Sequence, residues 1–239
     1  MQGRSPFEPG NRAGSQMKTD NIQYSLITPS RGDRPCALAQ AVDAVKLAAE
    51  QAGLSVDGLS GVEMLVGFDG VKGERVRDYP FIRYFDFPKD NDFGNAIRHG
   101  LLKASRGRRI IFHDDDNVLT PQAFCIYEAY PEADMLIGRI DVSRAFAKPW
   151  LPEIVEGREL VRQCNIDPLC LCLARSLVVD ICGGWQGQRY EADFLNIVRY
   201  YRRARKVIVV EDLLGIYDAG RGLDAGGLNF RQERLENSD

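Results

Sequence analysis

The sequence Arg109-Ile-Ile-Phe-His-Asp-Asp-Asp-Asn117 carries the strongest signal in the chain. Its apolar start is typical of a short buried strand, and three aspartates follow that strand almost at once. Adjacent carboxylates repel one another unless a positive charge lies between them. A divalent cation such as Mg²⁺ or Mn²⁺, which prefers carboxylate oxygens and also binds phosphate, would relieve that repulsion. The simpler alternative is a solvated turn in which Asp116 or Asn117 caps the helix near Pro121.

Apolar strands alternate with helical segments on both sides of this stretch. Further strands are expected at 24–28, 62–68, 82–85, 135–140 and 206–210, and helices at 38–52, 92–105, 175–182 and 191–203, with another helix opening at Pro121. This alternation predicts an α/β fold with a mostly parallel central sheet and helices on both faces. Asp69 follows its strand as Asp114 follows 109–112, so both are expected at the ligand-binding edge of the sheet.

Composition limits the classes of partner. The chain has 239 residues, of which 44% are hydrophobic and 27% charged, with a net charge of −3. That balance argues against a nucleic-acid partner, which usually requires a basic face. No segment is apolar for long enough to predict a transmembrane helix. The basic run 199–206 could make weak contact with an anionic membrane surface, although a solvated helix end is the simpler interpretation.

The chain ends and the cysteines give further expectations. Residues 1–16 are polar and lack a signal-peptide core, so we expect a disordered extension ahead of one domain at 17–239. The six cysteines include no C-x-x-C pair, so a zinc or redox site is not expected. Reduced thiols and a cytoplasmic location follow as the default expectation.

The acidic stretch also resembles a known family. The segment 105–121 resembles the A-x-G-x-y-I-x-F-x-D-x-D-D-x-x-x-P pattern of family 2 glycosyltransferases, with Asp114 and Asp116 in the D-x-D places and Pro121 at the family's proline. Four other stretches resemble the family in the correct order: 24–35, 62–70, 95–100, and 180–185 followed by 190–194. Together they cover about 24–203.

The resemblance implies a GT-A fold and a metal-dependent, inverting glycosyltransferase. It divides the domain into a nucleotide-binding half at about 17–120 and an acceptor-binding half at about 121–239. The implied donor is a nucleotide sugar, UDP- or GDP-linked, and the implied acceptor is a saccharide or a lipid-linked molecule. The implied cofactor is Mn²⁺ or Mg²⁺.

The resemblance also assigns residues to the donor site. Asp116 would bind the metal directly, and Asp114 would reach the ribose or a metal-bound water. Asp69 would contact the base or ribose. The remaining donor-site residues implied are Thr28, Pro29, Arg34 and Asp115.

The resemblance leaves two candidates for the catalytic base. An inverting transferase requires a carboxylate that accepts a proton from the acceptor hydroxyl. The segment Tyr190-Glu-Ala-Asp-Phe194 offers Glu191 or Asp193. Aligning the following helix with the family's pattern slightly favours Glu191. Either acid could instead complement the helix dipole. Trp185, which follows Gly183-Gly184, is the candidate for stacking on the acceptor side.

Two other functional classes compete with this interpretation. The strand followed by Asp114 and Asp116 also resembles the HAD-type phosphohydrolase signature, in which Asp114 would be the phosphorylated nucleophile and Asp116 the general acid. That motif normally opens its domain, whereas about ninety domain residues precede it here. The second alternative is a domain that binds a nucleotide sugar without turnover, because a fold alone does not establish activity.

Overall fold

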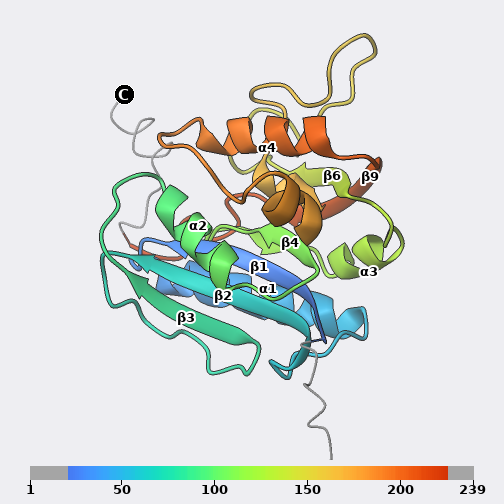
Figure 1. Cartoon of the computed structure of the whole chain (residues 1–239). Coiled ribbons are helices and arrows are strands. Elements are labelled where there is room, and N and C mark those ends of the chain that lie inside the picture. Colours follow the sequence, from blue (N-terminus) through green and yellow to red (C-terminus); the bar gives the residue numbers. More distant parts are fainter. Residues whose placement is uncertain (1–20, 226–239) are drawn as a thin grey trace, which may run out of the picture.

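A nine-stranded mixed sheet forms the centre of the computed structural model, which describes residues 21–225 (Figure 1). The extension expected at 1–16 lies outside these residues. The strands are β1 (Asn21–Ser30), β2 (Ser60–Asp69), β3 (Ile82–Phe87), β4 (Arg109–Phe112), β5 (Val118–Leu119), β6 (Met135–Asp141), β7 (Trp150–Leu151), β8 (Leu171–Ala174) and β9 (Val207–Ile216). The helices are α1 (Pro35–Gln51), α2 (Asn95–Ala104), α3 (Ala123–Glu128) and α4 (Ala192–Arg203), with a 3₁₀ turn η1 (Pro168–Cys170) and a π-helical turn η2 (Ser176–Ile181).

The sheet changes character halfway across. Its order is β3-β2-β1-β4-β8-β6-β9-β5, with β7 paired to β6. The four strands β3, β2, β1 and β4 run parallel, so their carboxyl ends meet at one edge. Antiparallel pairings join β8 to β4 and β6, β7 to β6, and β5 to β9, while β6 and β9 are parallel. The expected α/β class is confirmed, and its parallel part is the half that ends in Asp69 and Asp114.

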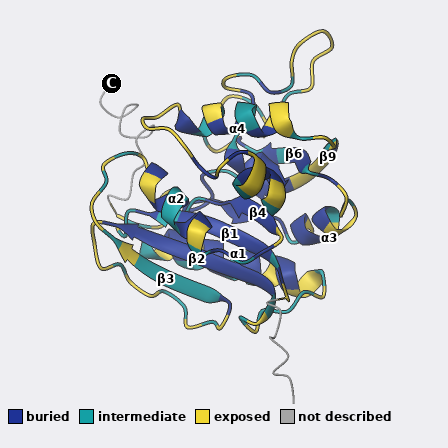
Figure 2. Ribbon diagram, in the orientation of Figure 1, coloured by how far each residue is buried: buried dark blue, intermediate teal, exposed yellow. Residues whose placement is uncertain are grey.

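Helices cover both faces of the parallel half (Figure 1). On one face, Tyr24 of β1 packs edge-on against Phe124 of α3 at 5.0 Å between ring centroids. On the other face, Gly67 of β2 lies so close to Ile97 of α2 that an added Cβ would come within 2.5 Å of the Ile97 side chain. Glycine therefore lets α2 sit directly on the sheet. The central strands are buried on both sides (Figure 2), as parallel strands between helix layers must be.

The structure refines several expected elements. The segment 175–182 contains a π-helical turn rather than a regular α-helix. The last strand continues to Ile216, well beyond the expected end at 210. The two-residue strands β5 and β7 were not expected, because only their pairing with β9 and β6 defines them. Within residues 21–225, no helix is long and apolar enough to span a membrane.

Candidate functional site

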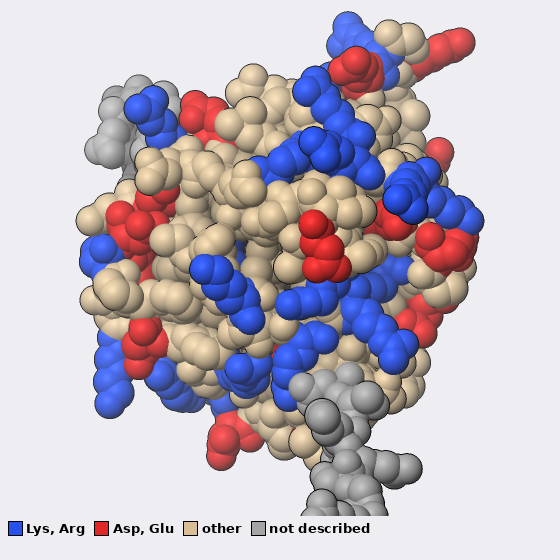
Figure 3. Space-filling model, viewed as in Figure 1, with Lys and Arg blue, Asp and Glu red and all other residues tan. Residues whose placement is uncertain are grey.

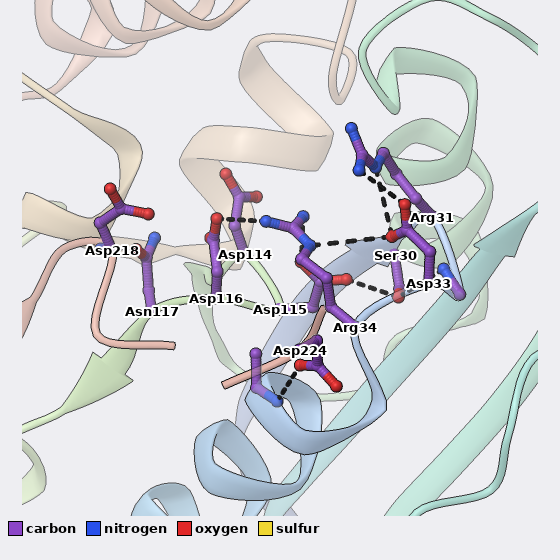
Figure 4. Close-up of polar contacts among 12 residues, drawn as sticks. Ser30, Arg31, Asp33, Arg34, Asp114, Asp115, Asp116, Asn117, Asp218 and Asp224 are labelled. Atoms are coloured by element: carbon purple, nitrogen blue, oxygen red, sulfur yellow. Dashed lines mark hydrogen bonds and ion pairs between the residues drawn. The ribbon is translucent and has the colours of Figure 1, made fainter. Parts of the chain in front are cut away.

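The three aspartates of the 109–117 stretch lie at the carboxyl end of β4, beside the carboxyl ends of β1 and β2 (Figure 4). They do not share one environment. The exposed fraction of the side chain is 41% for Asp114, 1% for Asp115 and 12% for Asp116. Asp114 therefore opens toward solvent, Asp115 turns into the protein, and the exposure of Asp116 is intermediate.

Arg34 holds the two inner aspartates. Its Nη2 donates to Asp115 Oδ1 at 2.5 Å, and its Nη1 donates to Asp116 Oδ2 (Figure 4). The hydroxyl of Ser30 donates to the other oxygen of Asp115 at 2.5 Å. Asp115 thus joins the end of β1 and the start of α1 to the turn after β4. The resemblance implies that Arg34 and Asp115 contact the donor, whereas in the structure both make contacts within the protein.

Arg98 of α2 neutralises the third aspartate. Its Nη2 donates to Asp114 Oδ1 at 2.5 Å, and its Nη1 donates to the backbone carbonyl of Phe93 at 2.7 Å. Because the side chain of Arg98 is only 9% exposed, this contact fixes Asp114 while leaving its other oxygen toward solvent. The resemblance of 95–100 to the family assigns no role to Arg98, so this contact was not predicted.

Asp69 lies where the sequence predicted, at the end of β2. Its carboxylate accepts from the backbone N–H of Asp90 at 2.7 Å and from Lys89 Nζ at 3.0 Å. It is 7% exposed. The loop that follows β3 therefore closes over the end of β2 and places an ammonium group beside this carboxylate.

Thr28 and Pro29, also expected in the donor pocket, lie just before the end of β1. Thr28 is fully buried, and within the described residues its hydroxyl has no hydrogen-bond partner. Its side chain therefore lies beneath the surface, which corrects the expectation that it lines a pocket. Pro29 is partly exposed and lies beside Gly94. His113 is also fully buried, and that burial lowers its pKa to about 4, so the imidazole is neutral.

A segment near the end of the described chain passes over the acidic turn. The backbone N–H of Asp218 donates to Asn117 Oδ1 at 2.8 Å, and that of Gly220 donates to the Asp116 carbonyl at 2.9 Å. An added Cβ at Gly220 would come within 2.4 Å of the Ala37 side chain, so this close approach requires glycine. Asp224 then accepts from the first free N–H groups of α1 (Figure 4), a cap supplied from far along the chain.

The two candidates for the catalytic base differ in position. Glu191 is exposed and precedes the first turn of α4. Asp193 is half-buried in that turn, and burial raises the pKa of its carboxyl; Arg98 opposes this shift and Asp114 adds to it. Asp193 is therefore the candidate whose carboxyl is influenced by both Arg98 and Asp114.

Asp167, which was not predicted as a site residue, is influenced by the same charges. It precedes η1 and accepts from the Leu169 N–H at 2.8 Å. Burial raises the pKa of its carboxyl to about 7, with Asp114 and Asp193 adding to the shift. The only local signal was an Asp before Pro168, which is typical of a helix cap and points to no site.

Trp185 does not present a stacking surface, which corrects the expected acceptor-side role. Its side chain is 2% exposed, and its ring centroid lies 4.6 Å from that of Phe112. Its indole N–H donates to Asn95 Oδ1 at 2.9 Å, and Arg98 lies 5.1 Å above the ring. Trp185 instead joins the loop after η2 to α2.

The residues present can accept a divalent cation only with help from a ligand. Within the described part of the chain, no three His, Cys, Asp or Glu side chains converge as a metal site. Asp114 and Asp116 offer hard oxygen donors, and Mg²⁺ commonly binds one or two carboxylates and takes its other ligands from phosphate and water. The pair fits a metal held jointly with a diphosphate, and Arg34 would then share Asp116 with that metal.

The sheet order, the helix layers and the acidic turn after β4 define a GT-A-type fold. Crystal structures of S. aureus TarS are similar: the 1–349 fragment matches with a TM-score of 0.66 and 14% identity over 81% of this chain. The UDP complex of that fragment matches with a TM-score of 0.67, and its UDP-GlcNAc complex with 0.66. The chain spans about 60% of the TarS fragment. No protein-family model matches the sequence, and no curated protein matches it significantly.

Proposed function

We propose that this protein transfers a sugar from a nucleoside-diphosphate sugar to an acceptor hydroxyl. The observation that carries the proposal is the placement of Asp114 and Asp116 after β4, at the edge where the parallel strands of a GT-A-type sheet end. TarS, which has a similar fold, has been crystallised with UDP and UDP-GlcNAc. A UDP-linked sugar is therefore the first donor to test, with a GDP-linked sugar as the alternative.

The donor would lie across the carboxyl ends of β1, β2 and β4. Asp69 would accept hydrogen bonds from the base or ribose, because its carboxylate lies at the end of β2 and is fixed by Lys89. Asp114 and Asp116 would hold Mn²⁺ or Mg²⁺ against the diphosphate. When bound, the metal would offset the negative charge that builds on the departing diphosphate. Arg98 fixes the Asp114 carboxylate from the opposite side.

Asp193 is the better candidate for the base, in place of Glu191. The Asp193 carboxylate would accept the proton from the acceptor hydroxyl as that oxygen forms its bond to the anomeric carbon. The bond from the anomeric carbon to the diphosphate breaks at the same time, and its electron pair leaves with the diphosphate. Attack opposite to the leaving group gives a product with inverted anomeric configuration. Burial raises the pKa of Asp193, which strengthens it as a proton acceptor.

Calorimetry with UDP, GDP and dTDP, each with and without Mn²⁺, tests the donor half of this proposal. We expect one nucleotide to bind, with an affinity that increases when Mn²⁺ is present and loses that increase in Asp116→Ala. The donor assignment fails if no nucleoside diphosphate binds, or if binding ignores both Mn²⁺ and Asp116→Ala.

Turnover assays separate the competing classes. Release of UDP from a UDP-sugar, with a sugar transferred to an added acceptor, supports the transferase. Tight donor binding without any release would favour the non-catalytic alternative. Phosphate release from phosphomonoesters would favour the phosphohydrolase, although between residues 21 and 225 no cap domain is inserted after Asp114.

A further inference from the structure

Helix α4 exposes two large apolar side chains, Leu195 and Tyr201. The inward face carries the buried residues Ala192, Asn196, Ile197 and Tyr200. The other side carries Leu195 and Tyr201, whereas Phe194 and Val198 are partly buried and pack against the hydrophobic core. Leu195 is 60% exposed and Tyr201 40% exposed. A surface helix normally turns polar residues toward water, so this face has the composition of one that meets a partner.

Basic residues lie close to Leu195 and Tyr201 on α4. Arg202 and Arg203 lie in the last turn of α4, and Arg205 follows directly; all three are exposed. Within residues 21–225, their guanidinium groups make no hydrogen bond or ion pair with the protein. Figure 3 shows Lys and Arg side chains gathered over this side of the molecule. The adjoining turn η2 adds Ile181, which is 45% exposed.

We propose that this α4 face, defined by Leu195, Tyr201, Arg202 and Arg203, docks on an anionic membrane surface. A helix lying in the plane of a bilayer places leucine and aromatic side chains at the boundary of the acyl chains, and its arginines at the lipid phosphates. Each basic residue near such a surface adds to the attraction. The exposed Leu195 and Tyr201 and the unpaired arginines of α4 supply both kinds of side chain.

Other partners fit this face less well. A nucleic acid would attract the arginines, but it would leave the exposed Leu195 against a charged backbone. A second copy aligned in parallel would bring unpaired arginines together, which costs free energy through like-charge repulsion. The anionic bilayer satisfies both parts of the face, and this inference does not depend on the proposed transferase activity.

Vesicle co-sedimentation of the full chain tests the inference. One set of vesicles contains phosphatidylcholine alone, and the other contains about one third phosphatidylglycerol. We expect binding to the anionic vesicles only, weakened by added salt. Arg202→Glu is expected to lower the partition coefficient about tenfold. Leu195→Ser is expected to lower it about fivefold, because Leu195 is exposed and its loss removes apolar contact with the lipid.

Matched controls make the result specific. Leu47 is a 54% exposed leucine on the outer side of α1, so Leu47→Ser makes the same chemical change on a different face. Lys72→Glu makes the same charge change in the exposed loop after β2. Both controls are expected to bind as the unchanged protein does. Equal binding to both kinds of vesicle, no vesicle binding, an equal loss in the controls, or a vesicle-independent dimer broken by Leu195→Ser would each overturn the proposal.

Discussion

Arg34 forms an ion pair with Asp115 at 2.5 Å, although 81 positions separate the two residues, and the Asp115 side chain is 1% exposed. The same guanidinium also reaches Asp116. The positive charge that three adjacent aspartates require is therefore supplied partly by the protein itself. This contact also separates the roles of the aspartates, since Asp115 is buried in contacts within the protein while the Asp114 side chain is 41% exposed.

Arg34→Met is expected to destabilise the protein by about 3–5 kcal/mol, because it leaves the buried Asp115 carboxylate without its partner. The measurement is the free energy of unfolding in urea. The double variant Arg34→Met/Asp115→Asn is expected to recover part of the loss, since it also removes the buried charge. Arg31→Met breaks a far more exposed ion pair with Asp33 and is the control, with an expected loss below about 1 kcal/mol. Equal losses in the two single variants would contradict this account.

Asp114→Asn and Asp116→Asn are expected to lower kcat/KM by about 10²–10³-fold, because each removes a carboxylate from the proposed metal site. The same variants are expected to weaken the dependence of UDP affinity on Mn²⁺, measured by titration calorimetry. Asp33→Asn, a change at an exposed carboxylate in the loop before α1, is the control. Unchanged Mn²⁺ dependence in both site variants would remove Asp114 and Asp116 from the proposed metal site.

Asp193→Asn is expected to lower kcat by about 10²–10⁴-fold with little change in donor affinity, because it removes the proposed general base. Glu191→Gln is the matched comparison, since Glu191 is exposed two positions earlier and is expected to keep near-normal turnover. The reverse pattern would reassign the base to Glu191. A product that retains the anomeric configuration of the donor would contradict direct displacement altogether.

The pH dependence of kcat gives a separate test of Asp193. The proposed base must be ionised to accept a proton, and burial raises the pKa of Asp193 above its ordinary value of 3.8. Activity is therefore expected to fall as the pH drops through this raised pKa, at a higher pH than an exposed carboxylate would give. In Asp193→Asn, the residual activity is expected to remain measurable and to lose this decrease at acidic pH. If the activity of that variant still falls at acidic pH, the decrease must come from the titration of another group.

Asp167→Asn is expected to stabilise the protein at pH 8 by about 1–2 kcal/mol and to have less effect at pH 4. The folded-state pKa of Asp167 is raised to about 7 from 3.8, so the folded protein binds this proton more tightly than the unfolded chain. The resulting stabilisation is complete below pH 3.8 and is lost as the pH rises toward 7. An asparagine keeps an oxygen for the Leu169 N–H and removes the charge.

Urea unfolding of Asp167→Asn at both pH values checks this expectation. Asp57→Asn is the control, because the pKa of that exposed carboxyl is lowered by hydrogen bonds from Leu59 and Ser60 N–H groups. Its substitution is expected to give no gain at pH 8. A gain for Asp167→Asn that is the same at both pH values would show that burial of the charge is not its cause.

Trp185→Phe is expected to destabilise the protein by about 1–3 kcal/mol, because it leaves the buried Asn95 oxygen without the indole N–H. The free energy of unfolding measures this loss, and acceptor saturation in the turnover assay measures any role in binding. The acceptor KM is expected to remain within about twofold, since only 2% of Trp185 is exposed. A large rise in that KM with normal stability would restore the stacking role.

The sequence by itself determined the parallel half of the sheet and the edge at which the proposed ligand site lies. The strand at 109–112 begins and ends where the apolar pattern predicted, and Asp114 follows its end. Asp69 ends β2 in the same way. These features are local. The periodic pattern of apolar residues, and the polar residue that follows a strand, are both encoded within a few sequence positions. The rule that parallel strands end at one edge then brings Asp69 and Asp114 to the same side.

Only the tertiary structure decided which acids face the site. Three adjacent aspartates have the same local pattern, and their exposures differ because Arg34 and Arg98 approach from separate elements. Asp167 joins Asp114 across more than fifty positions, and the burial of Trp185 depends on how α2 packs against β4. Such contacts arise from the packing of distant segments, whose mutual orientation no short stretch of sequence encodes.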